Sequence, residues 1–187
     1  MNPIFVAALA ASLTFGLPTF AQAAGSHAHG QGHGHGPNIG KPGDAAKAAR
    51  TITIVMKDNF YEPEEITVAK GETVRFVVVN QGDFVHEFNI GTADTHAAHQ
   101  KEMAMMFEHG VLEVDKINYA MMKMEMKDAQ GKVTTMEHND PNSALIEPGK
   151  DAEIVWTFST DAKLEFACNV PGHYDSGMVG PIAITSK

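Results

Sequence analysis

The only cysteine of the chain is followed at even spacing by a histidine and a methionine: Cys168, His173 and Met178 lie in the segment CNVPGHYDSGM. A thiolate, an imidazole and a thioether are all ligands of soft or borderline transition metals. Pro171-Gly172 favours a turn inside this segment, which would fold His173 and Met178 back over Cys168. The alternative for a lone cysteine is a buried, inert side chain that serves packing alone. The combination of three ligand types favours a metal-binding loop.

Strand parity supplies a second imidazole. Apolar residues alternate around His86 and before Cys168, so both side chains are expected to point inward from two different strands. Two imidazoles, a thiolate and a weakly bound thioether form the trigonal ligand set that holds type 1 copper. We therefore expect a copper site made of His86, Cys168, His173 and Met178. Copper would also explain the lone thiol, because a metal-bound thiolate is held away from disulfide exchange and oxidation.

The elements that must position these ligands are strands. Short runs rich in β-branched and aromatic residues recur from Thr51 onward, with turn residues between them, and such a series predicts an all-β fold, a β-sandwich. Two of the runs are separated by Lys70-Gly71, which we interpret as a hairpin-like break. The residues expected to share inward faces are Val74, Phe76 and Val78; Phe84, His86 and Phe88; Ile154, Trp156 and Phe158; Leu164, Phe166 and Cys168; and Ile182 and Ile184.

A segment of different composition, about residues 92–148, interrupts the strands. It holds eight of the eleven methionines and four of the ten histidines, and we expect it to be a partly helical insertion. The run after Thr95 lacks Gly, Pro and β-branched residues, which predicts a helix. On one face of that helix stand His96, His99, Met103 and Met106. These residues either pack against the sandwich or, with Met136 and His138 further on, form a secondary copper site.

The N-terminal region predicts export. Residues 1–23 combine an apolar stretch with Pro18 and the small-residue motif Ala21-Gln22-Ala23, which is typical of a cleaved signal peptide and favours a periplasmic protein. An uncleaved membrane anchor is the alternative; after cleavage we expect no stable membrane insertion. Residues 24–50 are Gly-rich and nearly free of apolar side chains, so we expect a disordered leader before a domain of residues 51–187. The leader is either a solvated linker or a metal-capturing segment, because it carries His27, His29, His33 and His35.

Net charge excludes one class of partner. The chain has a formal charge of -9 at pH 7, and nucleic-acid binding requires a basic surface, so we expect no nucleic-acid partner.

The segments DNFYEPEEITVAKGETVRFVVVNQGDFVHEFNIG and CNVPGHYDSGM resemble the cupredoxins, the family of plastocyanin, azurin and pseudoazurin. The resemblance covers about residues 51–91 and 150–187. It implies a Greek-key β-sandwich and a site for copper, as Cu(I) or Cu(II), made of His86, Cys168, His173 and Met178. The His-rich leader and the Met/His-rich insertion together resemble, more narrowly, the CopI-type periplasmic copper-tolerance cupredoxins.

Two positions depart from the electron-transfer cupredoxins. Glu87 stands where many of them have Asn, directly after the first His ligand, and Asn169 stands where they often have Ser or Thr after the Cys. In multicopper oxidases the type 1 Cys is flanked by His residues that lead to a second copper centre, whereas Ala167 and Asn169 flank it here. We therefore expect a protein that is not an enzyme, with an accessory oxidation of Cu(I) left open.

Two functions remain from the residues and the resemblance. The first is copper tolerance and homeostasis, by binding and redox-cycling copper. The second is a soluble electron carrier between redox partners. A carrier needs neither the histidines of the leader nor the methionines of the insertion, which favours the first. The expected partners are copper ions and a periplasmic redox partner or a copper transporter.

Overall fold

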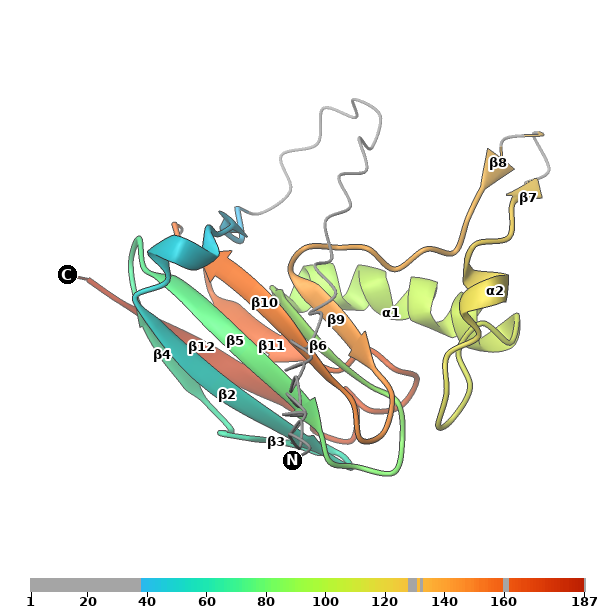
Figure 1. The fold of residues 1–187 in the computed structure, drawn as a ribbon, viewed down its shortest axis with the longest axis horizontal. Coiled ribbons are helices and arrows are strands. Elements are labelled where there is room, and N and C mark those ends of the chain that lie inside the picture. The colour runs from blue at the N-terminus through green and yellow to red at the C-terminus, as the bar shows by residue number, and fades with distance from the viewer. Residues whose placement is uncertain (1–37, 128–130, 132, 160–161, 187) are drawn as a thin grey trace, which may run out of the picture.

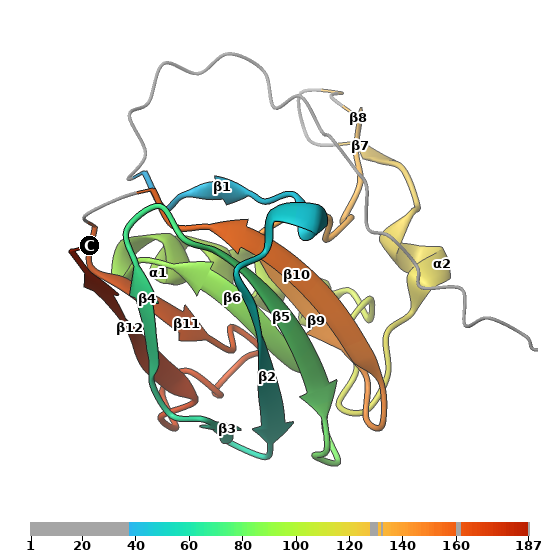
Figure 2. The same cartoon turned by 60° about the vertical axis from the view of Figure 1, so that its left-hand side comes forward.

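The computed structural model describes residues 38–127, 131, 133–159 and 162–186, and its described strands form two five-stranded sheets packed face to face (Figures 1 and 2). The first sheet has the order β1 (Lys41–Pro42), β10 (Asp151–Thr157), β5 (Thr73–Asn80), β2 (Arg50–Lys57) and β3 (Phe60–Glu62). The second has the order β4 (Ile66–Ala69), β12 (Val179–Thr185), β11 (Leu164–Ala167), β6 (His86–Gly91) and β9 (Ser143–Ile146). The predicted β-sandwich is confirmed.

Pairing within each sheet is mostly antiparallel. β2 runs parallel to β5, and β4 runs parallel to β12, while the other pairs of both sheets are antiparallel. Neighbours that are distant in sequence, such as β5 and β10, are joined by connections that cross from one sheet to the other (Figure 2). Strands β6 and β11 are neighbours in one sheet. His86 on β6 therefore lies close to the loop after β11, which carries the other candidate ligands.

The core fills the space between the sheets, as strand alternation predicted. The residues expected to point inward and found there with at most 5% of their surface exposed are Val74, Phe76, Val78, His86, Phe88, Ile154, Trp156, Phe158, Leu164, Phe166, Cys168 and Ile182. Phe84 and Ile184 are the exceptions: Ile184, near the end of β12, is only partly buried, and Phe84 precedes the start of β6 and is 38% exposed. The alternation that placed it inward applies only once the chain becomes extended at His86.

Lys70-Gly71 does not close a hairpin, contrary to our interpretation. β4 belongs to one sheet and β5 to the other, so the turn between them crosses the sandwich. Gly71 adopts a φ of +79°, and its N–H donates to the carbonyl of Phe158. Phe158 directly follows β10, which pairs with β5. Because β4 pairs with β12 and β5 pairs with β2 and β10, each run finds partners far away in sequence.

Regular structure is present before Thr51, where we expected the domain to start. β1 pairs with the edge of β10, Trp156 Nε1 donates to the carbonyl of Ile39 over 3.0 Å, and Asp44 caps a short 3-10 helix, η1 (Ala45–Lys47). Backbone pairing holds residues 38–50, which have few apolar side chains to signal it. The signal peptide and His27, His29, His33 and His35 lie outside the described residues.

The insertion contains the expected helix and ends earlier than expected. α1 (Ala93–Glu108) begins at a capping box formed by Thr92 and Thr95. It is followed by α2 (Tyr119–Met122) and by a two-stranded sheet of β7 (Met126–Lys127) and β8 (Val133–Thr134), which lie to one side of the sandwich (Figure 1). The chain rejoins the second sheet as β9, so the insertion spans residues 92–142. The run SALI was too short and too weakly apolar to signal a strand. Among the described helices, none is both long and apolar enough to cross a membrane.

Candidate metal centre

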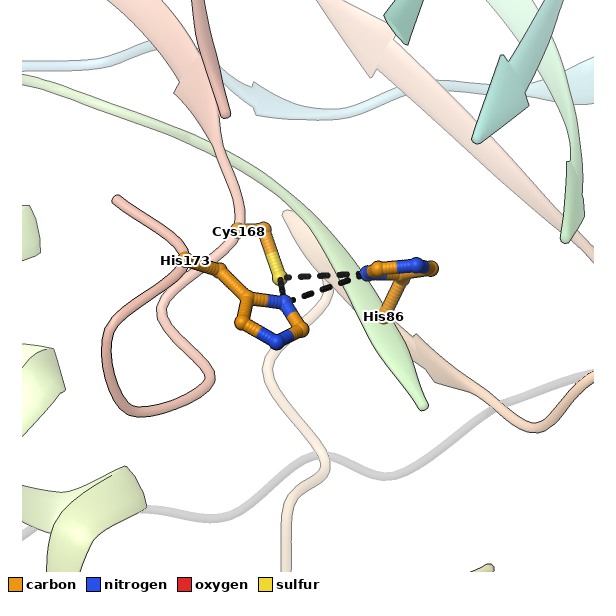
Figure 3. Close-up of side chains that lie close together, drawn as sticks. All are labelled: His86, Cys168 and His173. Carbon is orange, nitrogen blue, oxygen red and sulfur yellow. Dashed lines mark hydrogen bonds between the residues drawn. The ribbon is translucent and has the colours of Figure 1, made fainter. Parts of the chain in front are cut away.

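His86, Cys168 and His173 meet at one point between β6 and the loop that follows β11 (Figure 3). Cys168 Sγ lies 3.3 Å from Nδ1 of His173 and 3.9 Å from Nδ1 of His86, and the two Nδ1 atoms are 3.2 Å apart. Three potential ligand atoms thus form a small triangle. The spacing-based expectation brought these same three residues together.

Main-chain hydrogen bonds fix the loop that carries two of these side chains. The N–H of Cys168 donates to the carbonyl of Met178, and the N–H of Met178 donates to the carbonyl of His173, each over 3.0 Å. A third bond of 3.0 Å runs from the N–H of His173 to the carbonyl of Val170. The turn at Pro171-Gly172 therefore folds the chain back on itself as its sequence predicted. The hydrogen bond between Cys168 and Met178 joins the two ends of the loop.

Asp58 determines which nitrogen of His86 faces the cysteine. His86 Nε2 lies 3.0 Å from Oδ1 of Asp58, and an ionised carboxylate only accepts, so Nε2 carries the proton and Nδ1 presents a lone pair to Cys168. Burial lowers the pKa of His86, which favours the neutral ligand form, while the bond to Asp58 opposes that shift. Space is tight here: a Cβ on Gly82 would collide with Asp58 and lie 2.8 Å from Nε2 of His86.

Cys168 is fully buried and its sulfur accepts a main-chain hydrogen bond. Burial raises the pKa of the thiol to about 12, although the N–H of Glu87, 3.3 Å from Sγ, and the main chain of Val170 favour the thiolate. The metal-free thiol is therefore protonated at neutral pH. A cation that takes this site must displace the proton, and a pre-placed N–H then stabilises the sulfur charge.

His173 is the half-buried member of the group. Burial, together with the neighbouring His86, lowers the pKa of His173 to about 4, so the ring is a neutral ligand down to mildly acidic pH. The ring of Phe84 lies 6.4 Å from it, centroid to centroid, at the surface.

Met178 is completely buried and directly precedes β12. Two imidazole nitrogens, a thiol that ionises on binding and a buried thioether are the donor types that suit both Cu(I) and Cu(II). The donor set and the convergence of its three described nitrogen and sulfur atoms therefore fit a copper ion.

The four residues expected on one face of the insertion helix do not meet at one point. Met103 and Met106 belong to the hydrophobic core, as the packing alternative foresaw. His96 is fully buried; its Nδ1 lies 3.2 Å from Nδ2 of Asn169, and its Nε2 has no hydrogen-bond partner among the residues that the structure describes. His99 lies 2.9 Å from Oε1 of Glu87.

Two residues near the centre had no assigned role from sequence, Asp58 and the carboxylate of Glu87, whereas His138 was expected only as a further member of a secondary copper site with the helix residues. Glu87 has no exposed surface and forms a cluster with His99 and His138. Burial alone would raise the pKa of Glu87, but hydrogen bonds from His138 and His99 hold it well below its ordinary value. The sequence signal at this position was that Glu87 stands where many electron-transfer cupredoxins have Asn, and the structure shows that both faces of its strand are buried.

A family model described as a cupredoxin-like domain matches residues 29–135 of the chain. A copper-resistant cuproprotein CopI of Pseudomonas aeruginosa is 47% identical over 149 residues, covering 78% of this chain and 81% of that protein. The CopI of Rubrivivax gelatinosus is 39% identical over 146 residues, covering 78% and 72%. Among solved structures, reduced auracyanin of the photosynthetic bacterium Roseiflexus castenholzii aligns with a TM-score of 0.51 and 22% identity, over 74% of this chain and 98% of that one.

Proposed function

Because the chain belongs to the cupredoxin-like family, we propose that it is a periplasmic copper-binding protein of copper tolerance and homeostasis, with copper held by His86, Cys168, His173 and Met178. The observation that carries the proposal is the triangle formed by Cys168 Sγ and the Nδ1 atoms of the two histidines, with sides of 3.2, 3.3 and 3.9 Å. Copper bound there supplies one-electron chemistry by moving between Cu(I) and Cu(II).

The residues around the site prepare it in the absence of the ion. Asp58 holds the proton of His86 on Nε2, so the lone pair of Nδ1 faces the site. The N–H of Glu87 is aimed at the sulfur, and burial of Cys168 and Met178 excludes water from one side. Half-exposed His173 leaves the other side as the route by which a cation or an electron reaches the centre.

The tolerance role rests on the relatives and on what the chain carries beyond the site. Two relatives that are each named copper-resistant cuproproteins match over most of their length. The insertion and the leader hold eight histidines between them, more than a single copper centre uses. A predicted signal peptide, residues 1–23, supports a periplasmic location, where the protein would exchange copper with a transporter or electrons with a redox partner. We expect no independent oxidase activity, since Ala167 and Asn169 flank the cysteine.

A deletion strain tests the proposal. Growth on rising copper should be impaired and should be restored by the parent chain and by Asp175→Asn, an exposed change in the same loop, but not by Cys168→Ser. Normal growth of the deletion strain on copper would overturn the tolerance role.

A second candidate, the soluble electron carrier, is favoured by one observation. Phe84 is 38% exposed beside the ring of His173, which places an apolar group where a redox partner would dock. If the deletion strain tolerates copper normally but loses a respiratory or photosynthetic activity, this function replaces the first.

A further inference from the structure

A second cluster of metal-ligand types lies on the other side of Glu87 from the copper centre. Glu87 on β6, His99 on α1 and His138 near the end of the insertion place one carboxylate oxygen and two imidazole nitrogens together. Oε1 of Glu87 lies 2.9 Å from Nε2 of His99 and 2.8 Å from Nε2 of His138, and the two Nε2 atoms are 3.2 Å apart. The cluster uses neither Cys168 nor Met178.

These three sides have the lengths of an edge in a metal coordination sphere. Ligand atoms about 2.0–2.1 Å from one metal ion lie roughly 2.9–3.4 Å apart when the geometry is tetrahedral or square. A single ion capping the triangle would therefore reach all three atoms with little movement of the side chains.

Hydrogen bonding alone accounts poorly for the arrangement. Oε1 of Glu87 is also 2.5 Å from Oγ of Ser143 and 3.2 Å from Nδ2 of Asn89, so four potential donors converge on it. A carboxylate oxygen offers about two lone pairs. Two protonated Nε2 atoms 3.2 Å apart would moreover direct their hydrogens at the same point. A metal ion at that point would remove the need for both Nε2 hydrogens, because Oε1 of Glu87 and the two Nε2 atoms would then direct lone pairs at a positive charge.

Outer contacts orient the ligands as they do in built metal sites. Glu102 Oε2 lies 3.0 Å from Nδ1 of His99 and fixes the ring with Nε2 facing inward. The other carboxylate oxygen of Glu87 accepts hydrogen bonds from the main-chain N–H and Nδ2 of Asn169, over 3.1 and 2.8 Å. The side chain of His99 is 12% exposed and that of Glu102 is 65% exposed, so the cluster is reachable from solvent.

We propose that Glu87, His99 and His138 form a second metal site that binds a divalent cation of borderline character, with Cu(II) as its physiological occupant and Zn(II) as a working probe. Two imidazoles and a carboxylate lack the soft sulfur that favours Cu(I), and Cu(II) binds such nitrogen and oxygen ligands most strongly among the divalent first-row ions. The site is separate from the centre at Cys168.

The test is a titration of the full-length protein with Zn(II), after copper has been added until the visible absorption reaches its plateau. Calorimetry should find one more equivalent of Zn(II) bound to the parent chain than to His99→Gln or His138→Gln. His109→Gln is the matched control, because His109 follows α1 and its ring contacts the carbonyl of Met105. It should bind as much Zn(II) as the parent. The leader histidines are present in all four proteins and cancel.

Equal stoichiometry in all four proteins would overturn the proposal. If both ligand variants fail to fold, nuclear magnetic resonance of the parent decides. Zn(II) added to protein loaded with diamagnetic Cu(I) should shift the ring signals of both His99 and His138, and unmoved signals would overturn the site. Absence of visible absorption from every variant would instead refute the copper centre at Cys168, while the Zn(II) difference would still decide the second site.

Discussion

His86 Nε2 and Asp58 Oδ1 lie 3.0 Å apart, although three strands, β3, β4 and β5, separate the two residues along the chain. This contact fixes the tautomer of the one ligand that comes from β6. Asp58 lies in the turn after β2. Its carboxylate also accepts a hydrogen bond from the N–H of Asp83, which lies in the turn after β5, so both turns are connected to the centre.

Replacing Asp58 by Ala should weaken copper binding by about 10–100-fold, because outer hydrogen-bond partners contribute to metal affinity on this scale. His86 would then be free to protonate Nδ1 or to rotate. The measurement is competition for copper against a chelator of known affinity. Asp83→Ala, a neighbouring exposed carboxylate, should bind copper as the parent does; equal affinities for all three proteins would contradict the role of Asp58.

Replacing Cys168 by Ser should abolish the visible absorption of the copper-loaded protein, since the absorption requires a copper–thiolate bond. The measurement is the absorption spectrum after addition of one equivalent of Cu(II). Asp175→Asn, in the same loop, should remain coloured. A coloured Cys168→Ser protein would mean that the ligand assignment is wrong.

Met103 separates packing from metal binding in the insertion. It is fully buried in the core, so Met103→Ala should lower the free energy of unfolding by about 2–5 kcal/mol, whereas Met105→Ala, at a residue 49% exposed, should change it by less than about 0.5 kcal/mol. Denaturant unfolding measures both. Met103→Leu conserves volume and should keep every equivalent of Cu(I); loss of one would identify the thioether as a ligand.

Leader-bound copper should be lost at a higher pH than copper at the centre. An unperturbed imidazole protonates near pH 6.5, so Cu(II) held by His27, His29, His33 and His35 should dissociate below about that pH. Burial lowers the pKa of His173 to about 4, so this ligand stays neutral and the visible absorption persists at pH 5. Copper stoichiometry at pH 7.5 and 5 is the measurement.

The control is the full chain with all four leader histidines changed to Gln. This variant should bind fewer equivalents of copper than the parent chain at pH 7.5 and the same number as the parent at pH 5. An identical stoichiometry at both pH values would remove the leader from copper capture.

The sequence allowed the meeting of His86, Cys168 and His173 to be predicted because the chemistry of the candidate site is encoded locally. Three of the four expected ligands stand in one loop with a turn between them, and parity alone points His86 inward. The sandwich followed from the same alternation. The Lys70-Gly71 turn was misread because local sequence does not say which sheet the next strand will join. Pairing of β4 with β12 depends on residues more than a hundred positions away.

The second cluster was predicted only in part, for a similar reason: His99 and His138 were expected in a secondary copper site, but Glu87 was not. Glu87 lies on the strand face opposite His86, where alternation predicts exposure, yet α1 and the end of the insertion cover it. His138 sits in a segment without a periodic pattern, so only the folded chain brings it to His99. His99 itself was found by helical spacing, but with the wrong companions, because Met103 and Met106 turn toward the core.

Glu87 and the insertion depend on each other. The insertion leaves β6 after Gly91 and returns at Ser143 on the neighbouring antiparallel strand, so its ends lie close together. Closing a loop of about fifty residues instead of about four costs only roughly 2 kcal/mol more in chain entropy. Removal of the segment would, however, take away His99 and His138, which contact the carboxylate of Glu87, together with the cover that buries that carboxylate. The insertion therefore accounts for a glutamate at a position with no exposed surface, and without the segment Glu87 would be an ordinary solvent-exposed carboxylate on the outer face of β6.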